Sequence, residues 1–188
     1  GSLLMIEVDG PAACLDDAAQ ALIAAARGKG CLGVIAAHTA EEVAALWQTR
    51  KALSPALRKV APKKINEDVV VPVSHMPELI EGLGGLAERH RITIVNFGHA
   101  GNGNIHVNLL ANPDDPEEME RARLCLSEVF DLVLRLDGTL SGEHGIGVEK
   151  RDFVSREIDP TTLALMHAIK AQFDPNGILN PGKKLPPL

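Results

Sequence analysis

The 188-residue sequence contains no tyrosine, one tryptophan and four phenylalanines, so aromatic residues make up only 3% of it. This scarcity argues against a surface that stacks aromatic rings on nucleotide bases. Positive charge is not in excess either, since 19 lysines and arginines stand against 25 aspartates and glutamates, for a formal net charge of -6. We therefore expect no nucleic-acid partner, because phosphate binding needs a concentrated basic surface.

Long apolar runs and targeting signals are also lacking. No run approaches the ~20 residues of a membrane span, and the first residues do not show the basic and then apolar segments of a signal peptide. A soluble, cytoplasmic protein is expected. The three cysteines, Cys14, Cys31 and Cys125, are odd in number and lie in apolar surroundings, so we expect buried free thiols in a reducing compartment.

The hydrophobic pattern predicts alternating strands and helices. Strands are expected at 3–10, 31–38, 67–73 and on both sides of a hairpin within 91–110, and helices at 11–30, 39–60, 76–90, 112–138 and 159–178. A hairpin requires antiparallel pairing, which favours an α+β fold with helices on one face over a doubly wound parallel sheet. Residues 3–188 are expected to form one domain, with Gly1 and Ser2 a remnant of expression.

The hairpin segment FGHAGNGNIH, residues 97–106, holds two histidines around a glycine-rich turn. Residues 101–104 tolerate positive φ, as tight hairpin turns require. Strand pairing would bring His99 and His106 to opposite sides of one turn, and the period of two places Asn104, His106 and Asn108 on one face of the second strand. A buried strand rarely carries three polar side chains on one face, so this face is either exposed to solvent or part of a site.

A second cluster is the segment SGEHGIG, residues 141–147, whose glycines let the backbone approach a ligand closely. Neighbouring residues of an extended segment point to opposite sides, so Glu143 and His144 are expected to play different roles. Two imidazoles and a carboxylate are a common ligand set for a divalent transition metal. His99, His106 and Glu143 fit this set by type, which leaves His144 as a candidate general base.

Arg50, in the segment LWQTRKALSPALRK, is a third candidate. An arginine can hold a carboxylate with two parallel hydrogen bonds. The plain alternative is a solvated charge on a helix surface, just as the two histidines could be ordinary members of a hairpin.

Three segments in order, FGHAGNGNIHVN, SGEHGIGVEKR and FDPNGILNPGKKL, resemble the C-terminal domain of FAD-linked oxidases. This is the family of D-lactate dehydrogenase, the glycolate oxidase flavoprotein subunit and D-2-hydroxyglutarate dehydrogenase. Three further segments, LLMIEVDG, EVAALWQTRKAL and INEDVVVPVSHMPEL, also resemble it, so the similarity spans essentially the whole chain. The resemblance implies a ferredoxin-like antiparallel sheet with helices mainly on one face and further C-terminal helices.

The resemblance also implies a two-part enzyme. An N-terminal domain, expected to be absent from this chain, would bind FAD, and this chain would be the cap over the substrate. The whole enzyme would oxidise a D-2-hydroxy acid to the 2-oxo acid by hydride transfer to FAD. The isolated chain is expected to be inactive, and an unidentified electron acceptor could tie the enzyme to the inner membrane.

In the metal-dependent members, the resemblance implies metal ligands at His99, His106 and Glu143, with zinc or manganese as the ion. It implies that His144 removes the proton of the substrate hydroxyl. The chain departs from the family at the hairpin turn, where Asn102 stands at a position that is often aspartate. A charged group behind the ligands would then be missing.

The resemblance also implies three contacts around the substrate and the flavin. Arg50 matches the position that pairs with the substrate carboxylate, and Asn108 matches a polar contact to the substrate. Asn180, in the segment LNPGK, matches a C-terminal tail that lies near the flavin.

Two other functions use the same residues. A metal-dependent hydrolase would hold its ion with the same two histidines and glutamate and would activate water. A non-catalytic interaction module would use the polar hairpin as a binding lip and would hold no stoichiometric metal. Hydrolysis by the isolated chain with added zinc or manganese would favour the first alternative.

Overall fold

The computed structural model describes residues 1–188 and divides them into two units, Gly1–Ala52 and Leu53–Leu188. The first unit contains helix α1 (Ala12–Ala26) and most of α2 (Ala40–Leu57), both at predicted positions. At the start of α2, the Glu42 backbone N–H donates to the Thr39 hydroxyl (3.2 Å) and the Thr39 N–H to the Glu42 carboxylate (3.0 Å). This reciprocal pair is a capping box, which satisfies two of the unpaired N–H groups at a helix start.

Two predicted strands, 3–10 and 31–38, are wrong. Both segments lack a partner strand, and most of their residues are exposed. A strand persists only where a neighbour takes up its backbone hydrogen bonds. An alternating apolar pattern is compatible with a strand, but it does not show whether a second strand is present to pair with its backbone.

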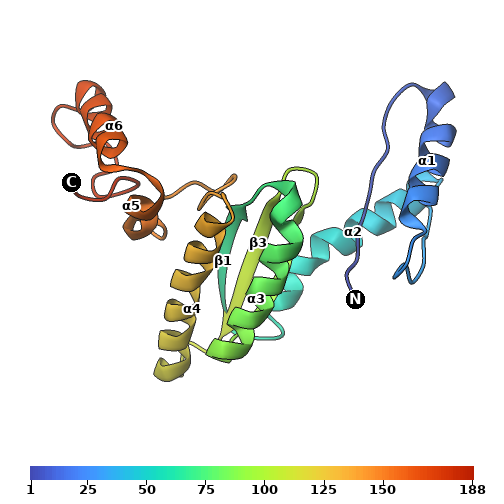
Figure 1. Cartoon of the computed structure of the whole chain (residues 1–188), viewed down its shortest axis with the longest axis horizontal. Helices are drawn as coiled ribbons and strands as arrows, with labels where there is room; N and C mark the ends of the chain where they lie inside the picture. The colour runs from blue at the N-terminus through green and yellow to red at the C-terminus, as the bar shows by residue number, and fades with distance from the viewer. The chain divides into compact units, whose positions relative to one another are not determined.

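The second unit folds as strand, helix, strand, strand, helix, followed by further helices at its C-terminal end (Figure 1). Its sheet has the order β1-β3-β2 with both pairs antiparallel, which confirms the predicted α+β fold. None of the helices combines the length and the apolar character that a membrane crossing needs. The elements are β1 (Lys63–Val70), a 3-10 turn η1 (Val73–His75), α3 (Met76–His90), β2 (Thr93–His99), β3 (Asn104–Ala111), α4 (Pro116–Arg135), η2 (Arg151–Phe153), α5 (Val154–Glu157) and α6 (Pro160–Phe173).

The two faces of the sheet have different compositions. Val107 and Leu109 of β3 belong to the hydrophobic core, together with Leu83 of α3 and Val129 and Val133 of α4. In Figure 1, α3 and α4 lie alongside the strands. Because side chains alternate along a strand, the even-numbered residues 104, 106 and 108 of β3 face away from this core. Those polar residues are available to a site on the other face.

The chain returns to the sheet directly after α4. Thr139 forms a β-bridge with Val70 at the end of β1, with hydrogen bonds of 2.9 and 3.1 Å. A Cβ atom on Gly138 would lie 2.3 Å from the Val70 carbonyl oxygen, so a side chain does not fit there. This bridge fixes the chain at the edge of the polar face, just before the glycine-rich segment 141–147 begins.

The hairpin between β2 and β3 turns through residues 100–103. Gly103 has a φ of 76°, and its carbonyl accepts the Val71 N–H at 3.2 Å. The Asn102 side-chain oxygen accepts the Asn104 N–H at 3.1 Å, as turn asparagines do. The predicted turn is confirmed, although only one of its residues uses positive φ.

We expect Gly103→Ala to destabilise the protein. A Cβ atom at Gly103 would lie 2.0 Å from the Val71 carbonyl oxygen, and the residue also has positive φ. Such strain costs about 1–3 kcal/mol in the free energy of unfolding, measured by urea denaturation. Gly101→Ala is the matched control, because its Cβ would have no neighbour within 4 Å and the expected change is within about 0.5 kcal/mol. Equal destabilisation by the two substitutions would contradict this account of the turn.

The cysteines divide into two classes, which corrects the prediction that all three are buried. Cys14 and Cys31 are exposed, and only Cys125 is buried. The reason is local: α1 has no buried residues, and residue 31 begins an exposed segment that pairs with no strand. Burial, together with the charge of Glu128, raises the pKa of the Cys125 thiol to about 11.

The thiolate is the reactive form of cysteine, so Cys125 should be protected in the folded protein. We expect a thiol reagent such as DTNB at pH 8 to modify Cys14 and Cys31 rapidly. Cys125 should react only after unfolding in guanidinium chloride. Rapid modification of all three thiols in the native protein would overturn the placement of Cys125.

Candidate metal site

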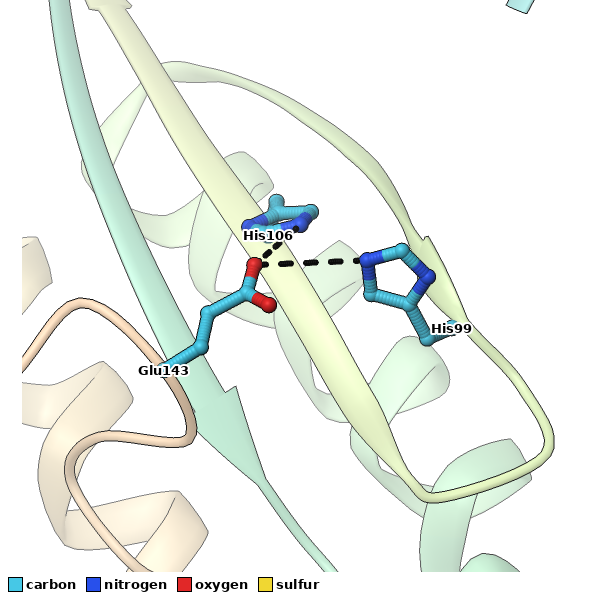
Figure 2. A group of neighbouring side chains, drawn as sticks. All are labelled: His99, His106 and Glu143. Carbon is cyan, nitrogen blue, oxygen red and sulfur yellow. Dashed lines mark ion pairs between the residues drawn. The ribbon is translucent and has the colours of Figure 1, made fainter.

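Three predicted ligands converge on the polar side of the sheet (Figure 2). His99 ends β2 and His106 lies in β3, and their ring centroids are 5.4 Å apart. Glu143 comes from the glycine-rich segment, and its Oε1 atom lies 3.2 Å from His106 Nε2 and 4.0 Å from His99 Nε2. The three donor atoms all lie within 4.8 Å of one another.

This spacing is compatible with a bound divalent metal. A tetrahedral ion that holds nitrogen and oxygen ligands at about 2.1 Å separates the ligand atoms by roughly 3.4 Å. The distances of 3.2 and 4.0 Å lie close to this value. The His106 side chain is 10% exposed, whereas those of His99 and Glu143 are about half exposed. The arrangement therefore has one firmly held ligand and an accessible side on which a further ligand could bind.

His144 lies beside the three candidate ligands. Its ring stacks on that of His106, with centroids 5.3 Å apart and an interplanar angle of 21°. Its Nε2 atom is 3.8 Å from Glu143 Oε1, so Glu143 and His144 reach toward the same place. This corrects the expectation that the two neighbours point to opposite sides, which assumed an extended segment. The chain bends at residues 142–144 instead.

The bend follows from one carboxylate. Asp68 Oδ2 accepts the backbone N–H groups of Gly142 (2.8 Å), Glu143 (2.5 Å) and His144 (2.9 Å). The Ser141 hydroxyl lies 3.3 Å from both Asp68 oxygens. Three successive N–H groups can point at one atom only if the backbone curls around it. The curl turns the side chains of Glu143 and His144 to the same side.

Asp68 is itself held in a buried charge cluster. The side chain is fully buried, and the Lys150 ammonium group donates to its Oδ1 atom and, at 3.0 Å, to its carbonyl oxygen. Burial alone would raise the pKa of Asp68, but the Glu143 N–H and Lys150 outweigh it and hold the pKa well below its usual range. The carboxylate therefore carries a negative charge at neutral pH. Lys150 also lies 3.5 Å from the Glu67 carboxylate, whose pKa burial raises.

Asn104 and Asn108 flank His106 on the same face of β3. Asn108 is fully buried, and its side-chain nitrogen donates to the carbonyl oxygens of Val95 (2.9 Å) and His106 (3.1 Å). A Cβ atom on Gly142 would lie 2.9 Å from the Asn104 side chain, so the glycine lets the loop pack directly on β3. The polar face predicted for β3 is thus buried rather than exposed to solvent, and the loop contacts it at Asn104 and His106.

Comparison with known proteins identifies the family. A family model described as FAD linked oxidases, C-terminal domain, matches residues 1–184. The chain belongs to this family. The resemblance seen in the sequence motifs is confirmed.

Curated relatives of this FAD-linked oxidase domain are similar over most of the chain. Glycolate oxidase subunit GlcD of Bacillus subtilis (strain 168) is 35% identical over 182 residues, which are 97% of this chain and 39% of that protein. D-2-hydroxyglutarate dehydrogenase of Stutzerimonas stutzeri (strain A1501) is 34% identical over 154 residues, 79% of this chain and 32% of that protein. D-lactate dehydrogenase [cytochrome], mitochondrial, of Arabidopsis thaliana is 35% identical over 144 residues, 76% of this chain and 25% of that protein. The chain thus spans less than two fifths of each of these relatives.

Two other predicted site residues of this FAD-linked oxidase domain lie on separate elements. Arg50 lies on α2 within the first unit. Asn180 lies in the exposed C-terminal tail with a φ of 49°, and its carbonyl accepts the Lys183 N–H at 3.3 Å. The parts assigned to them in binding substrate and flavin stay predictions.

Sequence reasoning missed Asp68, Glu67 and Lys150. The signal was present in the segment NEDVVV, where two acidic residues interrupt a strand just before three valines. Adjacent strand positions face opposite sides, so at least one of these acids had to be buried or placed in a site. The sequence offered no way to pair Asp68 with N–H groups that lie 74 to 76 residues away.

Proposed function

We propose that this chain is the substrate- and metal-binding part of an FAD-dependent dehydrogenase that oxidises a D-2-hydroxy acid to the 2-oxo acid. The convergence of His99, His106, Glu143 and His144 is the observation that carries the proposal. Family membership supports it, since relatives are named as a glycolate oxidase subunit, D-lactate dehydrogenase and D-2-hydroxyglutarate dehydrogenase. The substrate would be a small 2-hydroxy acid of this kind.

His99, His106 and Glu143 would hold the divalent ion, either zinc or manganese. Such an ion supplies positive charge that lowers the pKa of a substrate hydroxyl. The donor types and their spacing support this assignment. The half-exposed side chains of His99 and Glu143 leave an accessible side for the oxygen atoms of the substrate.

His144 would accept the proton of the substrate hydroxyl. Its Nδ1 atom lies 3.3 Å from the buried Asp68 carboxylate, which favours a proton on Nδ1 and leaves Nε2 able to accept another. Its side chain is 42% exposed, so a substrate can reach it. As the hydroxyl proton moved to Nε2, the hydrogen on the carbon that carries the hydroxyl would leave as hydride, and its C–O bond would become C=O. FAD supplies the acceptor for that hydride.

Arg50 would pair with the substrate carboxylate, for which the planar guanidinium group is suited. Asn108 would make a polar contact to the substrate, and Asn180 would lie near the flavin. An N-terminal FAD domain of the full-length protein would complete the site. The isolated chain should therefore bind no FAD and should turn over no 2-hydroxy acid.

The metal assignment predicts that the 188-residue chain, freed of metal by a chelator, binds one zinc ion per molecule. His99→Ala should lower the zinc affinity by more than about 100-fold, beyond the loss expected when only a partner of a ligand is removed. His75→Ala is the matched control, because His75 contacts Glu78 and lies outside the cluster. Isothermal titration provides the measurement. Equal zinc binding by the two variants would refute the ligand assignment.

The base assignment predicts a selective loss of turnover in the full-length protein. His144→Ala should lower kcat by about 10²–10⁴-fold, the usual contribution of a positioned general base, while the melting temperature stays close to that of the parent. The assay would follow reduction of an artificial acceptor with D-lactate, glycolate and D-2-hydroxyglutarate. Unchanged turnover would exclude His144 as the base. Ester or amide hydrolysis by the zinc-loaded chain would favour a hydrolase over the flavin enzyme.

A further inference from the structure

Asp68 connects two segments that are far apart in the sequence and that both contribute to the candidate site. On β1 it lies directly opposite His106 of β3 in the antiparallel register. Its Oδ2 atom accepts the N–H groups of residues 142–144, which carry Glu143 and His144. One side chain therefore sets the position of the loop relative to the strand that carries a candidate ligand.

The loop needs such an anchor because of its composition. Gly142, Gly145 and Gly147 increase the conformational freedom of the unbound segment. Gly145 and Gly147 have φ values of 79° and 59°. The only further hydrogen bond from the backbone of this bend runs from the Gly145 N–H to the Ser141 hydroxyl, at 2.8 Å, and that hydroxyl itself contacts Asp68. The conformation of the bend thus rests on the Asp68 carboxylate.

Asp68 also contacts the His144 ring, since Nδ1 lies 3.3 Å from Oδ1. The same Oδ1 atom accepts a hydrogen bond from the Lys150 ammonium group, which helps to hold the carboxylate in place. One oxygen therefore positions the backbone of the loop, and the other faces the ring. The carboxylate is fully buried and belongs to neither the three candidate ligands nor the accessible side of the site.

We propose that Asp68 is the positioning residue of this site: it holds Glu143 in reach of His99 and His106 and orients the ring of His144. The inference rests on the proposed function, because it gives those side chains their roles. Asp68 of β1 then supplies the negative charge that supports the ligands. In this chain that charge comes from a strand and not from the hairpin turn.

The test compares Asp68→Asn with Glu67→Gln in the 188-residue chain. Each substitution removes one of the two buried carboxylates that contact Lys150 and keeps the other. Only Asp68 contacts the loop. We expect Asp68→Asn to lower zinc affinity by about 10- to 100-fold, as loss of a ligand's partner does, and Glu67→Gln to change it less than about threefold. Circular dichroism would verify that both variants are folded. Equal losses in the two variants, or no loss in Asp68→Asn, would overturn the proposal.

A second measurement separates this proposal from the metal assignment. Nitrogen chemical shifts of the His144 ring in the metal-free parent chain report which ring nitrogen carries the proton. We expect the proton on Nδ1, facing Asp68, and a shift toward Nε2 in Asp68→Asn. If the parent chain binds no zinc, the metal assignment fails and the ring measurement alone decides the role of Asp68. A proton on Nε2 in the parent chain would overturn that role, and this holds even if Asp68→Asn does not fold.

Discussion

The hydrogen bonds from three successive backbone N–H groups to the Asp68 carboxylate are the interaction on which the site depends. Bonds to an ionised acceptor are stronger than those between neutral groups. Burying a carboxylate is costly, and Lys150 offsets that cost by direct contact. The result is a fixed anion at the edge of the sheet, around which a glycine-rich loop takes a single shape. Without the Asp68 carboxylate, the segment that carries Glu143 and His144 would lose most of the hydrogen bonds that order its backbone.

The antiparallel sheet makes this arrangement possible because one of its faces packs in the core and the other carries the residues of the site. One face of β3 supplies Val107 and Leu109 to the core beneath α3 and α4, which gives the strand a rigid support. The other face presents His106 and Asn108 at alternate positions. The hairpin adds His99, and the return of the chain at Thr139 brings the loop to the same edge. A site built on packed strands keeps its geometry better than one built on loops alone.

Local sequence signals predicted the parts of this structure that depend on local interactions. Helix α3 occupies the predicted range, and the hairpin turns where Gly103 allows it. The grouping of the two histidines with Glu143 followed from residue types and from the family motifs.

Long-range interactions decided the rest. The hydrogen bonds between Asp68 and the loop connect residues more than 70 positions apart, and no periodicity in the sequence predicts such a contact. The extended shape assumed for the segment around Glu143 and His144 was wrong because the anchoring carboxylate was unknown. The strands expected at 3–10 and 31–38 failed for a related reason, since the pattern of one strand does not reveal whether a partner exists.

The proposed site requires that one ion lie between ligands from the hairpin and from the loop that Asp68 orders. A crystal structure of the zinc-soaked chain, with anomalous data collected at the zinc edge, tests it most directly. We expect one strong peak within about 2.2 Å of His99 Nε2, His106 Nε2 and a Glu143 carboxylate oxygen. Zinc at other histidines only, or zinc on the hairpin without Glu143, would contradict it.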